Sequence, residues 1–280
     1  MGEQAIRAED FTWLCGMLRE ETAIVLNASK TYLVEARLRA LARSEGIEID
    51  ELLRRARSDV RAQADRQKVI EAMTTNETSF FRDTRIFRSL VDRVLPQLFE
   101  ERAAGEIRIW CAATSTGQEP YSVAMAIREG FPAHAAQVRI IGTDLDTQAL
   151  ARAEAGVYSG VEVQRGLPPD MLQRFFERDG SRYRLSGTVR SMVEFRQLNL
   201  VKPWPRLPSL DLVLIRNVLI YFDRSTKGDI LTRAAQLLTP KGMLVLGGTE
   251  SAIGCEVPLV SDKLGHCTVY RRKAGGSRGM

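Results

Sequence analysis

Apolar residues in the first quarter of the chain recur at the three- and four-residue spacing of amphipathic helices. Val34, Leu38 and Leu41 show this spacing, and no proline occurs over residues 9–73. Side chains three and four positions apart lie on one face of a helix, so each such stripe can be buried against a neighbouring helix. The pattern predicts a small all-helical domain over residues 1–75.

The helical pattern stops at residues 74–82, which read TTNETSFFR. Thr, Asn and Ser break the period there and mark a boundary before the next helix, expected over residues 86–98. Beyond Gly105, short apolar runs of strand length alternate with helical stretches. We expect strands over residues 107–112, 138–143, 210–215 and 243–246, helices from Pro120 and over residues 225–238, and a turn at residues 240–242.

This alternation is typical of a doubly wound, mostly parallel sheet, so residues 76–273 are expected to form an α/β domain with a Rossmann-like architecture. Residues 183–195 interrupt the alternation and predict a hairpin that turns at Ser186 and Gly187. We interpret this hairpin as an inserted small antiparallel β-subdomain at about residues 180–197.

Composition narrows the class of protein. The 280 residues are 44% hydrophobic and 27% charged, as in ordinary folded proteins. No apolar run approaches the roughly 20 residues that span a bilayer. The first residues, MGEQAIRAED, lack the basic start and apolar stretch of a secretory signal. We expect a cytoplasmic protein that does not insert into membranes.

The formal charge of +5 raises the question of nucleic-acid binding. Four of the basic residues lie in the final stretch RRKAGGSRGM, and without them the charge is +1. We interpret residues 274–280 as a disordered tail. Because the remainder is almost neutral and lacks interleaved aromatic and basic residues, the sequence does not favour a nucleic-acid partner.

The cysteines and histidines do not follow the spacing of a metal site. The four cysteines are scattered, without a C-x-x-C pair, and there are only two histidines. We therefore expect reduced thiols, no disulfide framework and no metal. The residues concerned are Cys15, Cys111, Cys255, Cys267, His134 and His266.

Candidate ligand-binding residues follow the first two strands of the predicted sheet. The first turn, CAATSTGQEPYS, has the single glycine Gly117 where dinucleotide-binding proteins show G-x-G-x-x-G. Glu119, at the start of the next helix, can bind a cationic amine, and Asp144, at the end of the second strand, can accept hydrogen bonds from ribose hydroxyls. Taken singly, Glu119 can instead be a carboxylate favoured by the helix dipole and Asp144 an N-cap. Together they indicate a ligand with nucleoside and amino-acid parts, which describes S-adenosylmethionine (SAM).

Five strings of the sequence, in this order, resemble those of the bacterial chemotaxis receptor methyltransferases, the CheR family. They are TTNETSFFRD, ATSTGQEPYS, IIGTDLDTQALARAEAGVY, VEFRQLNL and IRNVLIYFD. The resemblance extends from about Phe11 to Tyr270. It implies an N-terminal helical domain and a SAM-dependent methyltransferase sheet with an inserted β-subdomain.

The resemblance also implies roles for individual residues. Arg82 and Tyr221 would lie at the reacting centre as catalytic residues, and Arg82 would also contact the cofactor. Glu119 would contact the methionyl part of SAM and Asp144 its ribose. The family's turn often carries two consecutive Glu residues, where this chain has Gln118 and Glu119. The other implied cofactor-binding residues are Asn76, Thr78, Asn199, Leu200, Arg216 and Asn217.

The family's reaction is the methyl esterification of receptor glutamates, which produces S-adenosylhomocysteine (SAH). A glutamate with a pKa near 4.3 is already ionised at neutral pH, so the main requirement is positioning. Arg82 can hold that carboxylate while Tyr221 orients it. The string RNVLIYF lacks the two prolines of the [DN]-P-P-[YF] motif of amino-group methyltransferases, which favours an oxygen acceptor.

The implied partner is the cytoplasmic helical domain of a methyl-accepting chemotaxis receptor, and we expect the enzyme to act as a monomer. Lys30, Arg37, Arg39 and Arg43 lie on one predicted helix. They form either an ordinary solvated face or a docking surface for an acidic partner. Two other functions stay open, namely methylation of a small-molecule carboxylate and non-catalytic binding of SAM by an adaptor.

Overall fold

The computed structural model describes residues 6–26, 31–58, 62–102 and 105–273. The predicted tail at residues 274–280 and the predicted partner residue Lys30 lie outside these ranges. The chain divides into two compact units, Met1–Thr75 and Asn76–Met280. Each unit is described by itself.

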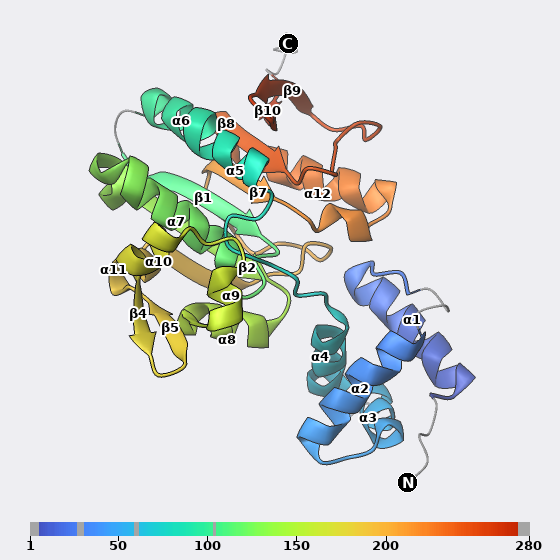
Figure 1. Ribbon diagram of the computed structural model, residues 1–280. Helices are drawn as coiled ribbons and strands as arrows, with labels where there is room; N and C mark the ends of the chain where they lie inside the picture. The colour runs from blue at the N-terminus through green and yellow to red at the C-terminus, as the bar shows by residue number, and fades with distance from the viewer. Residues whose placement is uncertain (1–5, 27–30, 59–61, 103–104, 274–280) are drawn as a thin grey trace, which may run out of the picture. The chain divides into compact units, whose positions relative to one another are not determined.

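Four helices form the described part of the first unit (Figure 1). Their buried apolar side chains include Leu14, Leu38 and Leu53, which are at most 1% exposed. The buried carboxylate of Asp10 is paired with Arg7 and Arg57, each at 2.8 Å. The expected all-helical N-terminal domain is confirmed. Its helices are α1 Ala8–Thr22, α2 Thr31–Glu45, α3 Ile49–Arg57 and α4 Ala62–Met73.

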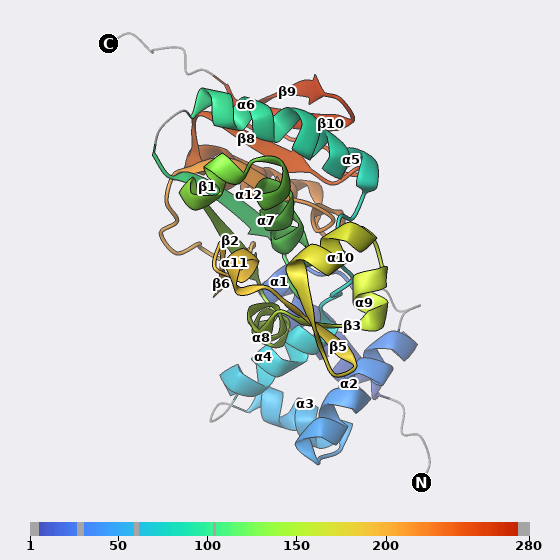
Figure 2. The ribbon, with the colours of Figure 1, turned by 60° about the vertical axis from the view of Figure 1, so that its left-hand side comes forward.

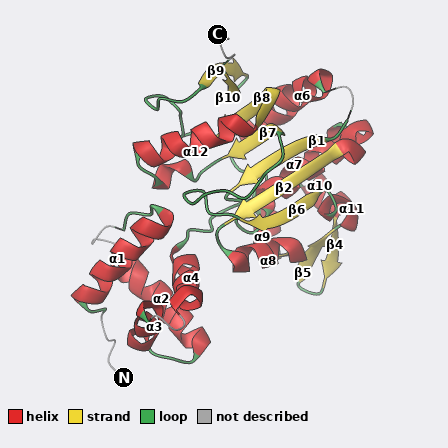
Figure 3. Cartoon of the chain, turned by 180° about the vertical axis from the view of Figure 1, so that it is seen from behind, coloured by secondary structure: helices red, strands yellow, loops and turns green. Residues whose placement is uncertain are grey.

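The second unit is built on a seven-stranded sheet in the order β6-β2-β1-β7-β8-β10-β9 (Figure 3). The neighbouring pairs from β6 to β8 are parallel, whereas β10 runs antiparallel to both β8 and β9. The expected mostly parallel sheet is confirmed. Its strands are β1 Ile107–Ala112, β2 Val138–Asp144, β6 Val193–Gln197, β7 Leu210–Ile215, β8 Leu238–Leu246, β9 Leu259–Leu264 and β10 Cys267–Arg272.

Alternate residues of the strands pack into two separate cores. Along β1, Ile109 and Cys111 belong to one core, and Trp110 and Ala112 to the other. This is the two-residue alternation of strand faces. Helices α6 and α7 cover the first face in Figure 1, and α12 covers the opposite face in Figure 3. The helices that cover the sheet are α5 Thr84–Ser89, α6 Leu95–Glu101, α7 Gln118–Gly130, α8 Thr147–Ala155 and α12 Arg224–Leu237.

Two element boundaries differ from the sequence predictions. The helix after the boundary segment begins at Thr84 and continues through the π-helical turn η2 Leu90–Val94. The expected turn at residues 240–242 lies inside β8, where the register against β7 shifts between Leu210 and Leu212. A bulged strand therefore replaces the separate turn and strand.

The inserted β-subdomain is a three-stranded antiparallel sheet in the order β3-β5-β4, formed by Val157–Ser159, Arg182–Leu185 and Phe176–Asp179 (Figure 2). The prediction of a turn at Ser186 and Gly187 is wrong. The hairpin turns between β4 and β5, at Gly180, which has a positive φ of 60°. Gly187–Arg190 forms the short helix α11 and β6 joins the large sheet, because Phe195 packs against that sheet's core. Two further short helices, α9 Gly160–Gln164 and α10 Pro169–Phe175, precede the hairpin.

Candidate functional site

The site lies where the order of the strands reverses. Strand β1 has β2 on one side and β7 on the other, so the chains leaving their carboxyl ends diverge and leave space for a ligand. The loop after β1 has an unusual backbone, with positive φ angles at Ala113 (54°), Ser115 (51°) and Gly117 (90°). A Cβ atom on Gly117 would lie 2.8 Å from the Cβ of Ala153. Backbone strain of this kind is typical of binding loops.

Asp144 is buried at the end of β2 and organises this loop. Its carboxylate accepts hydrogen bonds from the backbone amides of Ser115 (2.7 Å) and Asp146 (3.0 Å). Burial raises the pKa of Asp144, and these hydrogen bonds limit the rise. The N-cap of α8 is Asp146 and not Asp144, since the Asp146 side chain accepts hydrogen bonds from Gln148 and Ala149. The N-cap alternative for Asp144 is therefore wrong.

The segment Asn76–Arg82 is hydrogen-bonded to the loop after β1 and to the loop after β2. The Asn76 side chain donates to Asp146 at 2.5 Å, and the Asn76 carbonyl accepts from the Ser115 hydroxyl at 3.1 Å. Arg82 bends back, and its Nη1 donates to the carbonyl of Glu77 at 2.5 Å. The TTNETSFFR string therefore lies against the carboxyl ends of β1 and β2.

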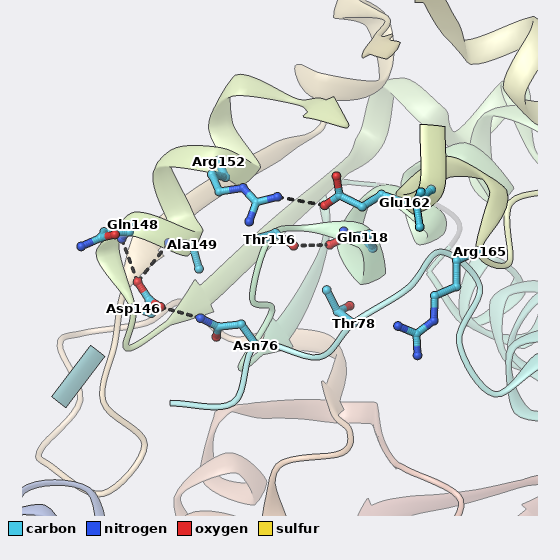
Figure 4. A pocket seen from close by; sticks show the side chains of 11 residues that line it. Asn76, Thr78, Thr116, Gln118, Asp146, Gln148, Ala149, Arg152, Glu162 and Arg165 are labelled. Carbon is cyan, nitrogen blue, oxygen red and sulfur yellow. Dashed lines mark hydrogen bonds and ion pairs between the residues drawn. The ribbon is translucent and has the colours of Figure 1, made fainter. Parts of the chain in front are cut away.

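A polar pocket lies beside this segment (Figure 4). Of the predicted cofactor-binding residues, it brings together only Asn76 and Thr78. Arg152 and Glu162 form an ion pair of 2.9 Å across it. The other lining residues are Thr116, Gln118, Asp146, Gln148, Ala149, Val161 and Arg165.

Glu119 and Arg216 form a buried ion pair. The Glu119 side chain is 13% exposed and that of Arg216 is 1% exposed, and Nη1 of Arg216 donates to Oε2 of Glu119 at 2.6 Å. The Nη2 atom of Arg216 contacts Asp83 at 3.1 Å and donates to the carbonyl of Arg82 at 2.8 Å. Arg216 therefore connects the end of β7 with the start of α7 and with the boundary segment.

Burial and the partner's charge shift the pKa of each of these two residues in opposite directions. Burial raises the pKa of Glu119, and Arg216 counteracts part of that rise. Burial also disfavours the charged form of Arg216, but Glu119 and Asp83 outweigh it and raise the pKa of Arg216. At neutral pH, Arg216 is therefore a fixed positive charge.

Two buried polar atoms beside these strand ends have no hydrogen-bond partner among the described residues. They are Nε of Arg216 and the Thr114 hydroxyl. Oε1 of Glu119 likewise accepts no hydrogen bond from the described residues. Buried polar groups are rarely left unsatisfied. Unused donors and acceptors at this edge fit a polar ligand with an amino group and hydroxyls.

The loop after β7 carries Asn217 and Tyr221. Asn217 has a positive φ of 60°, and Tyr221 lies 41% exposed at the end of the 3₁₀ turn η4 Leu219–Tyr221. The loop is held by Glu250, which the sequence analysis did not single out. Glu250 lies in the string GGTES after β8, and its contacts are formed across more than 30 residues, which no local pattern reveals.

Asn199 and Leu200 follow β6 in a loop held by α12. The Asn199 side chain accepts from the Val201 amide at 2.9 Å. Arg233 donates to the carbonyls of Leu200 (2.5 Å) and Lys202 (2.8 Å), and its guanidinium lies 4.3 Å from the ring centroid of Trp204. Arg233 was also missed, since an arginine on a helix carries no such signal.

The predicted partner residues lie in the first unit, on α2. Arg37 donates to the Met73 carbonyl at 2.6 Å and to the Thr75 hydroxyl at 3.3 Å, so it fixes the end of α4. Arg43 is exposed and Arg39 is half-buried. Arg37 therefore has a structural contact within the first unit, in addition to its predicted role in partner binding.

Within the described ranges, no helix is long and apolar enough to cross a membrane. Over the same ranges, no group of three or more His, Cys, Asp or Glu side chains is arranged to hold a metal ion.

Comparison with known proteins gives two family matches. Residues 9–74 match the CheR methyltransferase all-alpha domain, and residues 76–259 match the CheR methyltransferase SAM-binding domain. The chain is 43% identical over 248 residues to chemotaxis protein methyltransferase 1 of Pseudomonas aeruginosa, covering 86% of this chain and 90% of that protein. It is 39% identical over 251 residues to chemotaxis protein methyltransferase Cher2 of Pseudomonas putida, covering 88% and 91%.

Proposed function

The chain belongs to the CheR methyltransferase family, and from that premise we propose how its residues transfer a methyl group from SAM to glutamate side chains of chemotaxis receptors. The observation that carries the proposal is the pair of buried carboxylates at the carboxyl ends of adjacent strands. Glu119 follows β1, and Asp144 ends β2. An amine and a ribose are the two groups of SAM that such carboxylates recognise.

The residues present fit this cofactor. Glu119 would hold the amino group through its unused oxygen, with Arg216 keeping the pair in place. Asp144 would hold the ribose hydroxyls, and Asn199 with Leu200 would hold the adenine. Asn76, Thr78, Arg82 and Asn217 would complete the site. When bound, SAM supplies a methyl group already activated by a positively charged sulfur.

Arg82 and Tyr221 are the proposed catalytic residues. Nη1 of Arg82 is bonded to Glu77, while its other guanidinium nitrogens have no partner among the described residues and can hold a carboxylate. Tyr221 is exposed, and its hydroxyl can orient the second oxygen of that carboxylate. One lone pair of the substrate glutamate then stays directed at the methyl group. Such positioning is the main contribution that the protein has to make.

The basic residues of α2 are proposed to bind the receptor. Arg39 and Arg43, with Lys30 outside the described residues and Arg37 partly engaged, would attract the acidic helices of a receptor's cytoplasmic domain. The enzyme would act in the cytoplasm as a monomer. Steering by these charges would change the rate of encounter more than the chemistry.

A labelling experiment tests the function. The protein is incubated with methyl-labelled SAM and purified receptor signalling domains, and the labelled receptor is then treated with base. Release of methanol is expected, because carboxyl methyl esters hydrolyse in base and methylamines do not. Label confined to small molecules would favour a small-molecule methyltransferase, and SAM binding without any transfer would favour an adaptor.

A further inference from the structure

The carboxylate of Glu250 accepts hydrogen bonds from four backbone amides. Three of the amides are consecutive in the loop after β7, namely Asn217 (2.7 Å), Val218 (2.9 Å) and Leu219 (2.7 Å). The fourth is that of Gly247, at 2.8 Å, which directly follows β8. Each oxygen of Glu250 accepts two of these bonds.

Three successive amides that point at one place form a concave anion-binding site of the kind called a nest. Here the anion belongs to the protein itself. The loop needs such support, because Asn217 has a left-handed backbone with φ of 60° and Val218 has φ of −127° and ψ of −33°. A non-glycine residue in a left-handed conformation is strained and persists only where its surroundings enforce it.

Glycine at position 247 is part of the same arrangement. A Cβ atom there would lie 2.6 Å from Oε2 of Glu250 and 3.0 Å from the backbone nitrogen of Asn217. The loops after β7 and β8 can therefore approach each other only because residue 247 has no side chain. Glu250 fills the place where the two loops meet.

The nest holds residues that the proposed function uses. Asn217 is bonded to Glu250 directly. Tyr221 lies two residues after Leu219, and its own amide donates to the Val218 carbonyl at 3.2 Å. The position of the Tyr221 side chain therefore depends on a loop in which the amides of residues 217–219 all donate to one carboxylate.

We propose that Glu250 is a positioning residue for methyl transfer, which fixes the loop after β7 so that Tyr221 and Asn217 face the reacting groups. The inference rests on the proposed function. Glu250 need not contact SAM or substrate, because it acts through the backbone of the loop.

The Glu250 loop has a second support, so its variants can fold. The Ala252 amide donates to the Tyr270 hydroxyl at 3.2 Å, and the Cys255 thiol contacts the Arg224 carbonyl at 3.9 Å. These contacts do not involve the nest. Glu256 lies exposed in the same loop and provides a matched control, Glu256→Gln.

The experiment compares Glu250→Gln and Glu250→Ala with Glu256→Gln in receptor methylation and in SAH binding by calorimetry. Glutamine keeps the shape of the Glu250 side chain but places an NH2 group against two backbone N–H donors. Alanine removes the acceptor from all four amides. We expect kcat to fall at least about tenfold in both variants, with a smaller loss of SAH affinity and no change in the control. Acetate should partly restore kcat of Glu250→Ala, whereas chloride at the same ionic strength should not.

A double-mutant cycle separates positioning from loss of folding. Tyr221→Phe should lower kcat much less in the Glu250→Gln background than in the wild type, because the hydroxyl of a displaced Tyr221 no longer contributes to the reaction. Full additivity, or a folded Glu250→Gln protein with wild-type kcat, would overturn the inference. Wild-type turnover in the same assay tests the proposed function separately. If the wild type does not methylate receptors, the proposed function fails irrespective of what the variants do.

Discussion

The guanidinium of Arg216 donates a 2.6 Å hydrogen bond to the carboxylate of Glu119, although 97 positions separate the two residues in the chain. The same guanidinium contacts Asp83 and the carbonyl of Arg82. One buried cation therefore holds the end of β7, the start of α7 and the segment that carries the proposed catalytic arginine.

Removal of Arg216 should destabilise the fold strongly. Arg216→Met leaves Glu119 buried without a counter-ion, which typically costs about 3–5 kcal/mol. The double variant Arg216→Met/Glu119→Gln should recover part of this loss, because a neutral amide then replaces the Glu119 carboxylate and only the more exposed Asp83 still lacks Arg216. Urea denaturation of the wild type and of these two variants measures the effect. A loss below about 1 kcal/mol in the single variant would show that the pair is not needed for stability.

As the pH is lowered, SAH affinity should begin to fall at a higher pH than the usual pKa of a glutamate carboxyl would predict. Burial raises the pKa of Glu119, so protonation of this carboxyl begins at a higher pH than the usual value near 4.5. A ligand ammonium binds the ionised form, so binding releases a proton and weakens as pH falls through the raised pKa. Calorimetry at several pH values, in buffers of different ionisation enthalpy, measures both effects.

The control for this pH profile is Glu119→Gln, which cannot titrate. Its SAH affinity should be lower at neutral pH, and the part of the profile that belongs to Glu119 should disappear. Asp144 also has its pKa raised by burial, so some pH dependence remains in the variant. A profile identical to that of the wild type would exclude Glu119 as the titrating group.

Much of the fold follows from local patterns, and the site follows from them only in part. The strands at residues 107–112 and 210–215 were predicted with the observed bounds, because both are short apolar runs between polar segments. The hairpin turn was misplaced because Ser186-Gly187 is as good a turn signal as Gly180-Ser181. Only the packing of Phe195 against the large sheet distinguishes them.

Glu250 and Arg233 show why the supports of the site escape sequence reasoning. Both act through backbone groups, and peptide amides and carbonyls are the same at every position. A carboxylate that accepts from the amides of residues 217–219 needs no particular side chains there. Asp144 could be proposed as a ligand-binding residue because its carboxylate directly follows a predicted strand, where such residues are common.

Arg233 should control affinity for the nucleoside end of the cofactor. Arg233→Gln removes the donor pair to Leu200 and Lys202 and the contact with Trp204, which frees the loop proposed to hold adenine. We expect SAH affinity to fall by about threefold to tenfold, comparable to one or two hydrogen bonds.

A matched control for Arg233 exists in the helical unit. Arg57 lies 4.8 Å from the ring centroid of Trp13 and donates to the carbonyl of Glu9, which repeats the ring and carbonyl contacts of Arg233, and it also pairs with Asp10 at 2.8 Å. Arg57→Gln should lower the unfolding free energy without changing SAH affinity. Equal losses of affinity in both variants would mean that general destabilisation explains the Arg233 result.

Charge reversal on α2 should slow receptor methylation without weakening SAH binding. Arg43 is exposed, so Arg43→Glu changes the charge of this face without touching the buried core, and the combination with Arg39→Glu extends the change to a half-buried position. We expect kcat/KM for receptor domains to fall about threefold to tenfold at low salt and to approach the wild-type value at high salt, where charges are screened. Arg37 is left intact because it bonds the Met73 carbonyl.

Arg19→Glu, at an exposed position of α1, makes the same charge change elsewhere in the unit and should have little effect. If Arg19→Glu slows the reaction as much as Arg43→Glu does, net charge and not a docking face on α2 governs the encounter.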